Sequence, residues 1–103
     1  MKINAQLLSV KKQGNGDATA VFGCAVENVT EILEFLEDVS IKFWIDGAKE
    51  ESIVGHIYST SVNASSNSSK SKFTIKCPES ENIKTSQLSS LCGREMLINI
   101  ELA

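Results

Sequence analysis

The chain has 103 residues, of which 42% are hydrophobic and 22% charged, and its formal net charge is −3. This size fits one domain, 1–103, and excludes two independent globular units, while the composition excludes a disordered chain. The negative net charge argues against a duplex-binding protein, and the lack of a leader or a long apolar run predicts a cytoplasmic protein with no membrane partner.

Alternating apolar residues predict a β-hairpin at the start of the chain. Ile3, Ala5 and Leu7 alternate with polar residues, and the same period of two resumes from Ala18 to Cys24. Residues 11–17, between these runs, are rich in Gly, Asn and Asp, which tolerate the positive φ of tight turns. The glycines here lack the spacing of a phosphate-binding loop, so we predict a turn.

A helix and a third strand follow the hairpin. Asn28 is a good cap residue, and the apolar residues after it have helical spacing. The period returns to two in residues 41–45, before Gly47. The first half, 1–47, is therefore predicted to be ββαβ. The inward side of its helix is formed by Val29, Ile32, Leu33 and Leu36.

The second half, 51–103, repeats this order. Its two first strands are separated by the Ser-rich stretch 59–71, which we predict to be a mobile loop. Thr85 is placed to cap a short helix, and Gly93 to end it in the left-handed conformation. The predicted apolar side of this half consists of Ile53, Gly55, Ile57, Phe73, Ile75, Cys77, Leu88, Leu91, Met96, Ile98, Ile100 and Leu102.

The two halves align with small steps in offset. The offset is 50 for the first strands, 53 for the second strands and 55 for the helices and last strands, and each step falls where a loop can absorb an insertion. We therefore predict an α+β fold in which internally duplicated ββαβ units form one pseudo-twofold domain, with about six mostly antiparallel strands and two helices. One continuous sheet and two packed sheets both remain open.

Catalytic and metal chemistry have little support in the residue pattern. His56 is the only histidine, and the three cysteines, Cys24, Cys77 and Cys92, form no C-x-x-C pair. We predict reduced, buried thiols, no catalytic residue, no metal and no cofactor. The carboxylates around the first helix are predicted to form a solvated face, with an acidic binding surface as the alternative. They are Glu27, Glu31, Glu34, Glu37 and Asp38.

Trp44 and Tyr58 each lie opposite the predicted core side of their strand, as do Val54, His56 and Leu97. An apolar outward face is typically covered by the rest of the fold, a second subunit or a partner. We predict a small non-enzymatic interaction protein that uses these residues to bind a protein partner, with a homodimer left open. Its size and acidity are typical of accessory and inhibitor proteins of phages and mobile elements.

The alternative function is single-stranded nucleic-acid binding. Trp44 and Tyr58 would then stack on bases, and lysines would neutralise the phosphates, although the net charge counts against this function. The candidate lysines are Lys11, Lys12, Lys42, Lys70 and Lys72.

Overall fold

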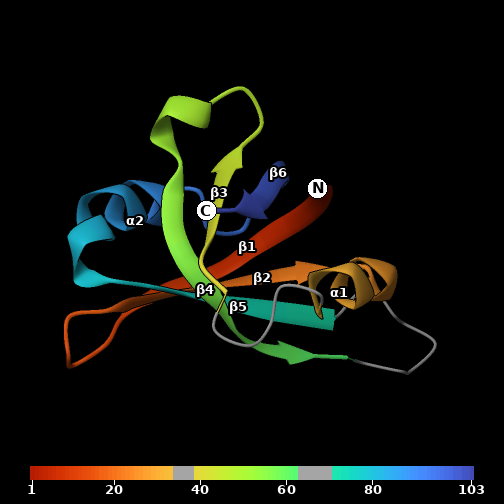
Figure 1. The fold of residues 1–103 in the computed structure, drawn as a ribbon, viewed down its shortest axis with the longest axis horizontal. Coiled ribbons are helices and arrows are strands. Elements are labelled where there is room, and N and C mark those ends of the chain that lie inside the picture. Colours follow the sequence, from red (N-terminus) through yellow and green to blue (C-terminus); the bar gives the residue numbers. More distant parts are fainter. Residues whose placement is uncertain (34–38, 63–70) are drawn as a thin grey trace.

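In the computed structural model, six strands form a closed antiparallel β-barrel (Figure 1). The structure describes residues 1–33, 39–62 and 71–103. Around the barrel the strands follow the order β1-β2-β5-β4-β3-β6, so β1 and β6 close it. The strands are β1 (Lys2–Lys12), β2 (Ala18–Cys24), β3 (Ile41–Ile45), β4 (Ile53–Ser61), β5 (Ser71–Cys77) and β6 (Glu95–Leu102).

Two short helices accompany the barrel, at opposite sides of it in Figure 1. Helix α1 (Val26–Ile32) connects β2 towards β3, and α2 (Asn82–Ser89) lies between β5 and β6. Two single 3₁₀ turns, η2 (Lys49–Glu51) and η4 (Glu79–Glu81), precede β4 and α2. The described chain is therefore a compact, mostly β domain rather than an even mixture of helices and strands.

The core is the interior of the barrel, filled by the alternating apolar residues of the strands. Three phenylalanines lie at its centre: the Phe22 and Phe73 rings stack with centroids 5.2 Å apart, and Phe43 meets Phe22 edge-on at 6.0 Å. These rings, from β2, β5 and β3, are at most 2% exposed. The predicted period of two is confirmed in β1, β2, β4 and β5, whose inward residues are all buried.

Two bulges interrupt the strand pairing. The register shifts between Leu7 and Ser9 where β1 pairs with β2, and between Ile57 and Ser59 where β4 pairs with β5. A bulge places an extra residue on one strand and bends it. The alternation of apolar residues along β1 and β4 did not predict either bulge.

Helix α1 begins earlier than predicted. Asn28 is not its cap, because Ala25 is the last extended residue and its carbonyl accepts hydrogen bonds from the backbone N–H groups of Asn28 and Val29. This start turns Val29 and Ile32 into the core and leaves Leu33 43% exposed, contrary to its predicted inward position. Leu36 lies outside the described residues.

The second half also differs from its predicted boundaries. Thr85 does not cap α2; it lies buried within the helix and donates its hydroxyl to the carbonyl of Asn82 at 3.1 Å, because η4 leads directly into α2. The predicted loop 59–71 is too long, since β4 continues through Ser61 and β5 begins at Ser71. Residues 63–70 lie outside the described part of the chain. Leu102, the last residue of β6, is 59% exposed rather than inward.

Candidate functional site

The five predicted partner-binding residues fall into two groups on the barrel wall. Trp44 on β3 and Leu97 on β6 are partly buried on neighbouring strands, whereas Val54, His56 and Tyr58 follow one another along β4. Phe43 pairs with Ile53, and Tyr58 lies five residues farther along β4, which corresponds to about 16 Å. Trp44 and Tyr58 therefore do not form one continuous patch.

The surroundings of Trp44 are paired within the chain. The ammonium group of Lys49 lies 5.2 Å from the centre of the indole ring. Asp46 follows the last residue of β3. Its carboxylate accepts a hydrogen bond from Asn99 Nδ2 at 2.9 Å and forms an ion pair with Lys2 at 3.3 Å. The hydrogen bonds from Asn99 and Lys2 hold the pKa of Asp46 below its usual value of 3.8. Asn99 and Lys2 thus connect Asp46, at the end of β3, with β6 and β1.

Tyr58 is the most exposed aromatic side chain of the described residues, at 61%. It lies at the bulge of β4, and Lys76 Nζ is 5.3 Å from its ring centre. Gln13 and Asn15, at the tip of the first hairpin, line a shallow depression beside Tyr58 and Lys76. Tyr58 thus projects from the wall close to the β1–β2 turn.

We call the outward side of β2 and β5 the β2–β5 face. Its centre is the pair Val21 and Thr74, with Lys72 and Lys76 on β5. Leu8, the bulge residue of β1, is 38% exposed and packs over Gly23 of β2. Leu8 and Tyr58 therefore flank this face from β1 and β4. The face as named comprises Leu8, Thr19, Val21, Gly23, Tyr58, Lys72, Thr74 and Lys76.

The five candidate nucleic-acid lysines are not brought together. Lys11 pairs with Thr19 and is exposed beside the β2–β5 face, where Lys72 is also exposed. Lys42 lies across the barrel in a 3.1 Å ion pair with Glu101. Lys12 lines a separate depression next to α2, and Lys70 lies outside the described residues. Lys76, which was not among the predicted residues, joins the face with a 3.9 Å ion pair to Asp17.

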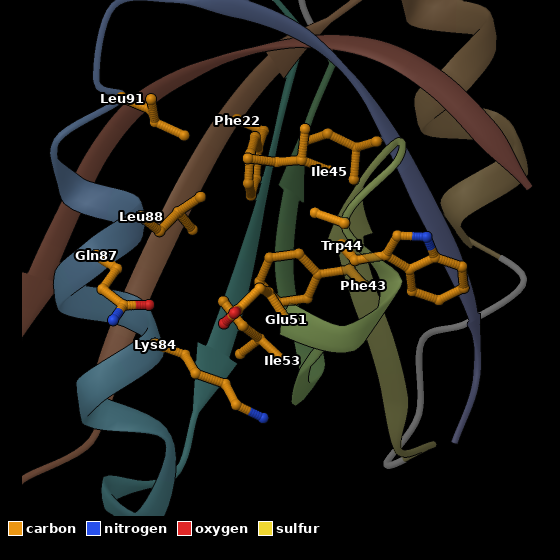
Figure 2. Close-up of a pocket in the computed structure, with 12 residues that line it drawn as sticks. Phe22, Phe43, Trp44, Ile45, Glu51, Ile53, Lys84, Gln87, Leu88 and Leu91 are labelled. Atoms are coloured by element: carbon orange, nitrogen blue, oxygen red, sulfur yellow. The ribbon is translucent and has the colours of Figure 1, made fainter.

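A cavity of about 170 Å³ opens at one end of the barrel, between α2 and the strands β3 and β4 (Figure 2). We call it the barrel-end cavity. Alternation places Phe43, Ile53 and Ile98 of its lining on the core side, whereas Trp44, which also lines the cavity, was predicted to face outward. One signal was present in the sequence: Lys84 and Gln87 share a helical stripe with Leu88 and Leu91, at i, i+3, i+4 and i+7. Two polar residues on that stripe prevent α2 from sealing the barrel with apolar side chains alone.

The cysteines differ in exposure. Burial, aided by Glu27, raises the pKa of Cys24 to about 11, and burial, aided by Glu81 and Asp17, raises the pKa of Cys77 to about 12. Cys92 is exposed, which corrects the prediction of three buried thiols, because it lies in the turn after α2 and not on the helix face.

The described residues contain no group of three or more His, Cys, Asp or Glu side chains able to hold a metal ion. Glu27 and Glu31 are exposed on α1, whereas Glu34, Glu37 and Asp38 lie outside the described part of the chain. Within the same residues, no helix has the length and apolar character needed to span a bilayer.

Comparison of this chain with protein-family models, with curated proteins and with solved structures finds no match.

Proposed function

We propose that this chain is a small non-enzymatic interaction protein that binds a protein partner through its β2–β5 face. The observation that carries the proposal is the 61% exposure of Tyr58 in a strand of the barrel wall. Tyrosine offers a large, rigid contact area with a polar end, and it is enriched among the residues that dominate binding energy at protein interfaces.

The form of the face favours docking of a partner surface over addition of a strand. The barrel is closed, so each of its six strands already pairs on both sides. The centre of the face is small and uncharged, at Val21 and Thr74, and Leu8 and Tyr58 provide apolar contacts at its two sides. We therefore expect the partner to place a flat apolar patch against this centre, between Leu8 and Tyr58.

Charge indicates the chemistry of the partner. Lys11 and Lys72 are exposed at the face, and Lys76 has a long ion pair, 3.9 Å, to Asp17 in addition to its contact with the Tyr58 ring. The whole chain nevertheless has a net charge of −3. A partner with carboxylates around its apolar patch would therefore be attracted to this face and repelled by much of the remaining surface.

Site-specific photo-cross-linking tests this assignment in cells that naturally make the protein. A benzophenone amino acid is placed at position 58 and, as the matched control, at Ile83, which is 77% exposed on α2. We expect a discrete cross-linked product from position 58 only, and a yield at least about fivefold lower when Leu8→Ser or Lys72→Glu is added. No product at position 58, or equal products at both positions, would contradict the proposal.

A second copy of the chain is the alternative protein partner. Light scattering of the purified protein distinguishes it from a different protein. A dimer that Tyr58→Ser converts to a monomer would identify the face as a homodimer interface. A monomer in both cases leaves the cross-linked product to identify another protein.

Single-stranded nucleic acid is a second candidate ligand of the same face, because the Tyr58 ring lies beside Lys76, with Lys11 and Lys72 nearby on the wall. Anisotropy of a labelled oligo-dT is the suitable measurement, since Trp44 lies on another part of the barrel. Binding that weakens steeply with salt and disappears in Tyr58→Ala would replace the protein-binding assignment. We expect no binding.

We also propose that the barrel arose by internal duplication of a ββαβ unit. Strand order supports this, because exchanging the halves leaves the order of neighbours unchanged. Register supports it as well. Ile3 of β1 pairs with Ile98 of β6, and the predicted offsets of 50 and 55 turn this pair into Ile53 and Phe43, which pair between β4 and β3.

The bulges agree with the same offsets. Leu8 and Tyr58, fifty residues apart, are the bulge residues of β1 and β4. The helices require a small correction to the alignment, since the buried Ile32 corresponds in position to the buried Leu88 and the predicted equivalent Leu33 is exposed. On this proposal, the two sides of the β2–β5 face derive from the same ancestral residue position.

A further inference from the structure

The barrel-end cavity has an apolar interior and a narrow polar border. Phe22, Phe43 and Ile98 contribute from the barrel, Leu88 from α2, and Leu91 from the turn that follows α2. Figure 2 shows α2 facing the Phe43 side of the barrel across the cavity, while the Trp44 indole points away from it. The polar lining residues are Glu51, Lys84 and Gln87.

The cavity is open because of how α2 meets the barrel. The ammonium group of Lys84 donates to the carbonyl of Ser52, between η2 and β4, at 2.9 Å and lies 3.7 Å from Glu81 of η4. These partners hold the charged end of Lys84 at the border. Helix α1 meets the barrel differently from α2. Its residues Val29 and Ile32, which face the barrel, are apolar and fully buried.

The size of the cavity limits what it can hold. Its volume of about 170 Å³ is close to that of an engineered, dry apolar cavity of about 150 Å³ that binds benzene in another protein. A molecule of roughly six to nine non-hydrogen atoms fits such a space. Long lipids and nucleotides are too large for it.

The lining also limits the charge and shape of the ligand. The one cation at the border, Lys84, is already compensated by Glu81 and Ser52, and Glu51 also lines the cavity, so an anionic ligand would lose hydration without gaining a free partner. Phe22 and Phe43 are at most 2% exposed, so a ligand lies above these rings and contacts the partly buried Ile45, Ala48 and Leu91. Gln87 can accept or donate one hydrogen bond at the border.

From these features we propose that the barrel-end cavity is a binding site for a small, neutral, aromatic molecule of the size of phenol or indole. Its ring packs against Ile45, Ala48 and Leu91, three apolar lining residues that are only partly buried, and its single polar atom points towards Gln87. The site is separate from the β2–β5 face, and the proposal is independent of the function proposed for that face.

The test is a titration of the purified full-length protein, followed by methyl NMR, with phenol, indole and benzoate. We expect phenol and indole to shift the methyl signals of Ile53, Leu88 and Ile98, with Kd on the order of 0.1–1 mM. Benzoate, the charged probe, is expected to bind at least about tenfold more weakly than phenol. Absence of these shifts at millimolar indole, or equal binding of benzoate and phenol, overturns the proposal.

Variants of α2 and of the turn after it locate the site. In that turn, Leu91→Trp fills the cavity from its partly buried edge and should weaken indole binding at least about tenfold. Ile83→Trp, at an exposed position of α2, should change indole binding by less than about twofold. If Leu91→Trp does not fold, Gln87→Phe at the border is the second filling variant. Indole binding that survives in a folded filling variant overturns the proposal.

The remaining occupant is a side chain of a protein partner. If the partner identified by cross-linking at position 58 shifts the same cavity methyl signals, and indole alone does not, the cavity belongs to the partner interface. That outcome also overturns the small-molecule site, and leaves the interaction function in place.

Discussion

Asp46 illustrates how single residues on this barrel depend on strands remote in sequence. Its carboxylate lies at the end of β3 but accepts its interactions from Asn99 on β6 and Lys2 on β1. Tyr58 is the opposite case, since its ring has one cation beside it and is otherwise exposed. Paired residues of the first kind contribute to stability, and exposed residues of the second kind are available for binding.

Asp46 should make stability depend on acid pH. Its pKa in the folded protein is below 3.8, its usual value in an unfolded chain, so its contribution is present at neutral pH and is lost as the pH falls below about 3.8. We expect Asp46→Asn to flatten the decline in the free energy of unfolding between about pH 6 and 2.5, measured with urea. Glu50→Gln, at an exposed position in η2, is the control, and an unchanged profile for Asp46→Asn contradicts this prediction.

Thiol reactivity should separate the three cysteines. Cys24 and Cys77 are buried and have raised pKa values, so they lack both access and thiolate, whereas Cys92 is exposed. With Ellman's reagent at pH 8 we expect one thiol to react rapidly in the folded protein and all three after denaturation. The rapid phase should disappear in Cys92→Ser; its persistence there would show that a buried thiol is accessible.

At the scale of elements, β4 is the strand with the tightest constraint. Gly55 points inward and pairs with Ile41 on β3. A Cβ atom at this position would lie 2.7 Å from the carbonyl oxygen of Lys76 and 3.0 Å from Ile75 Cγ2. The close approach of β5 requires glycine here, whereas a periodic sequence pattern only shows that position 55 faces inward.

Gly55→Ala should therefore destabilise the protein by about 1–3 kcal/mol, because the backbone of β5 must move to admit the methyl group. Gly14→Ala in the first turn is the matched control, since an added Cβ there meets nothing within 4 Å. We expect that variant to change the free energy of unfolding by less than about 0.5 kcal/mol. Urea unfolding measures both, and equal effects at the two positions would refute the packing explanation.

At the scale of the whole molecule, closure of the barrel joins the two halves. Four of the six strand pairings, β2–β5, β3–β4, β3–β6 and β1–β6, connect residues 1–47 with residues 51–103. The stacked rings of Phe22 and Phe73 also come from different halves. Each half alone would lose these four strand pairings and expose much of its apolar side to water.

Separate fragments 1–47 and 51–103 should consequently be unfolded as monomers, with no cooperative thermal transition by circular dichroism. Mixing the two fragments should restore the β-sheet signal in circular dichroism if the barrel can assemble from two chains. A monomeric fragment that unfolds cooperatively would show that one ββαβ unit has a sufficient core of its own.

The prediction of strands succeeded because side-chain alternation is a local property of the backbone. The inward residues of β1, β2, β4 and β5 could be identified without knowing which strands are neighbours. Helix starts were less predictable, as Asn28 and Thr85 show, because helix α1 begins at an extended alanine and α2 continues directly from η4.

The candidate site was only partly predictable, for a similar reason. Alternation correctly placed Tyr58 on the outside, but the bulge beside it and the proximity of Lys76 depend on β5. Alternation also placed Trp44 outside without indicating that Lys49 lies over it and that it is only partly exposed. Whether either residue binds a partner stays a prediction.

The amino-acid sequence by itself determined that this protein is a single domain with six strands and two short helices, and which side of most strands faces the core. Only the tertiary structure decided that the strands close into one barrel, that Leu8 and Tyr58 flank the β2–β5 face, and that a cavity remains beside α2. The physical reason is range: alternation and helical spacing act between neighbours in the chain. Closure, register and the volume left inside depend on contacts between residues far apart in sequence, whose positions are set jointly when the barrel closes.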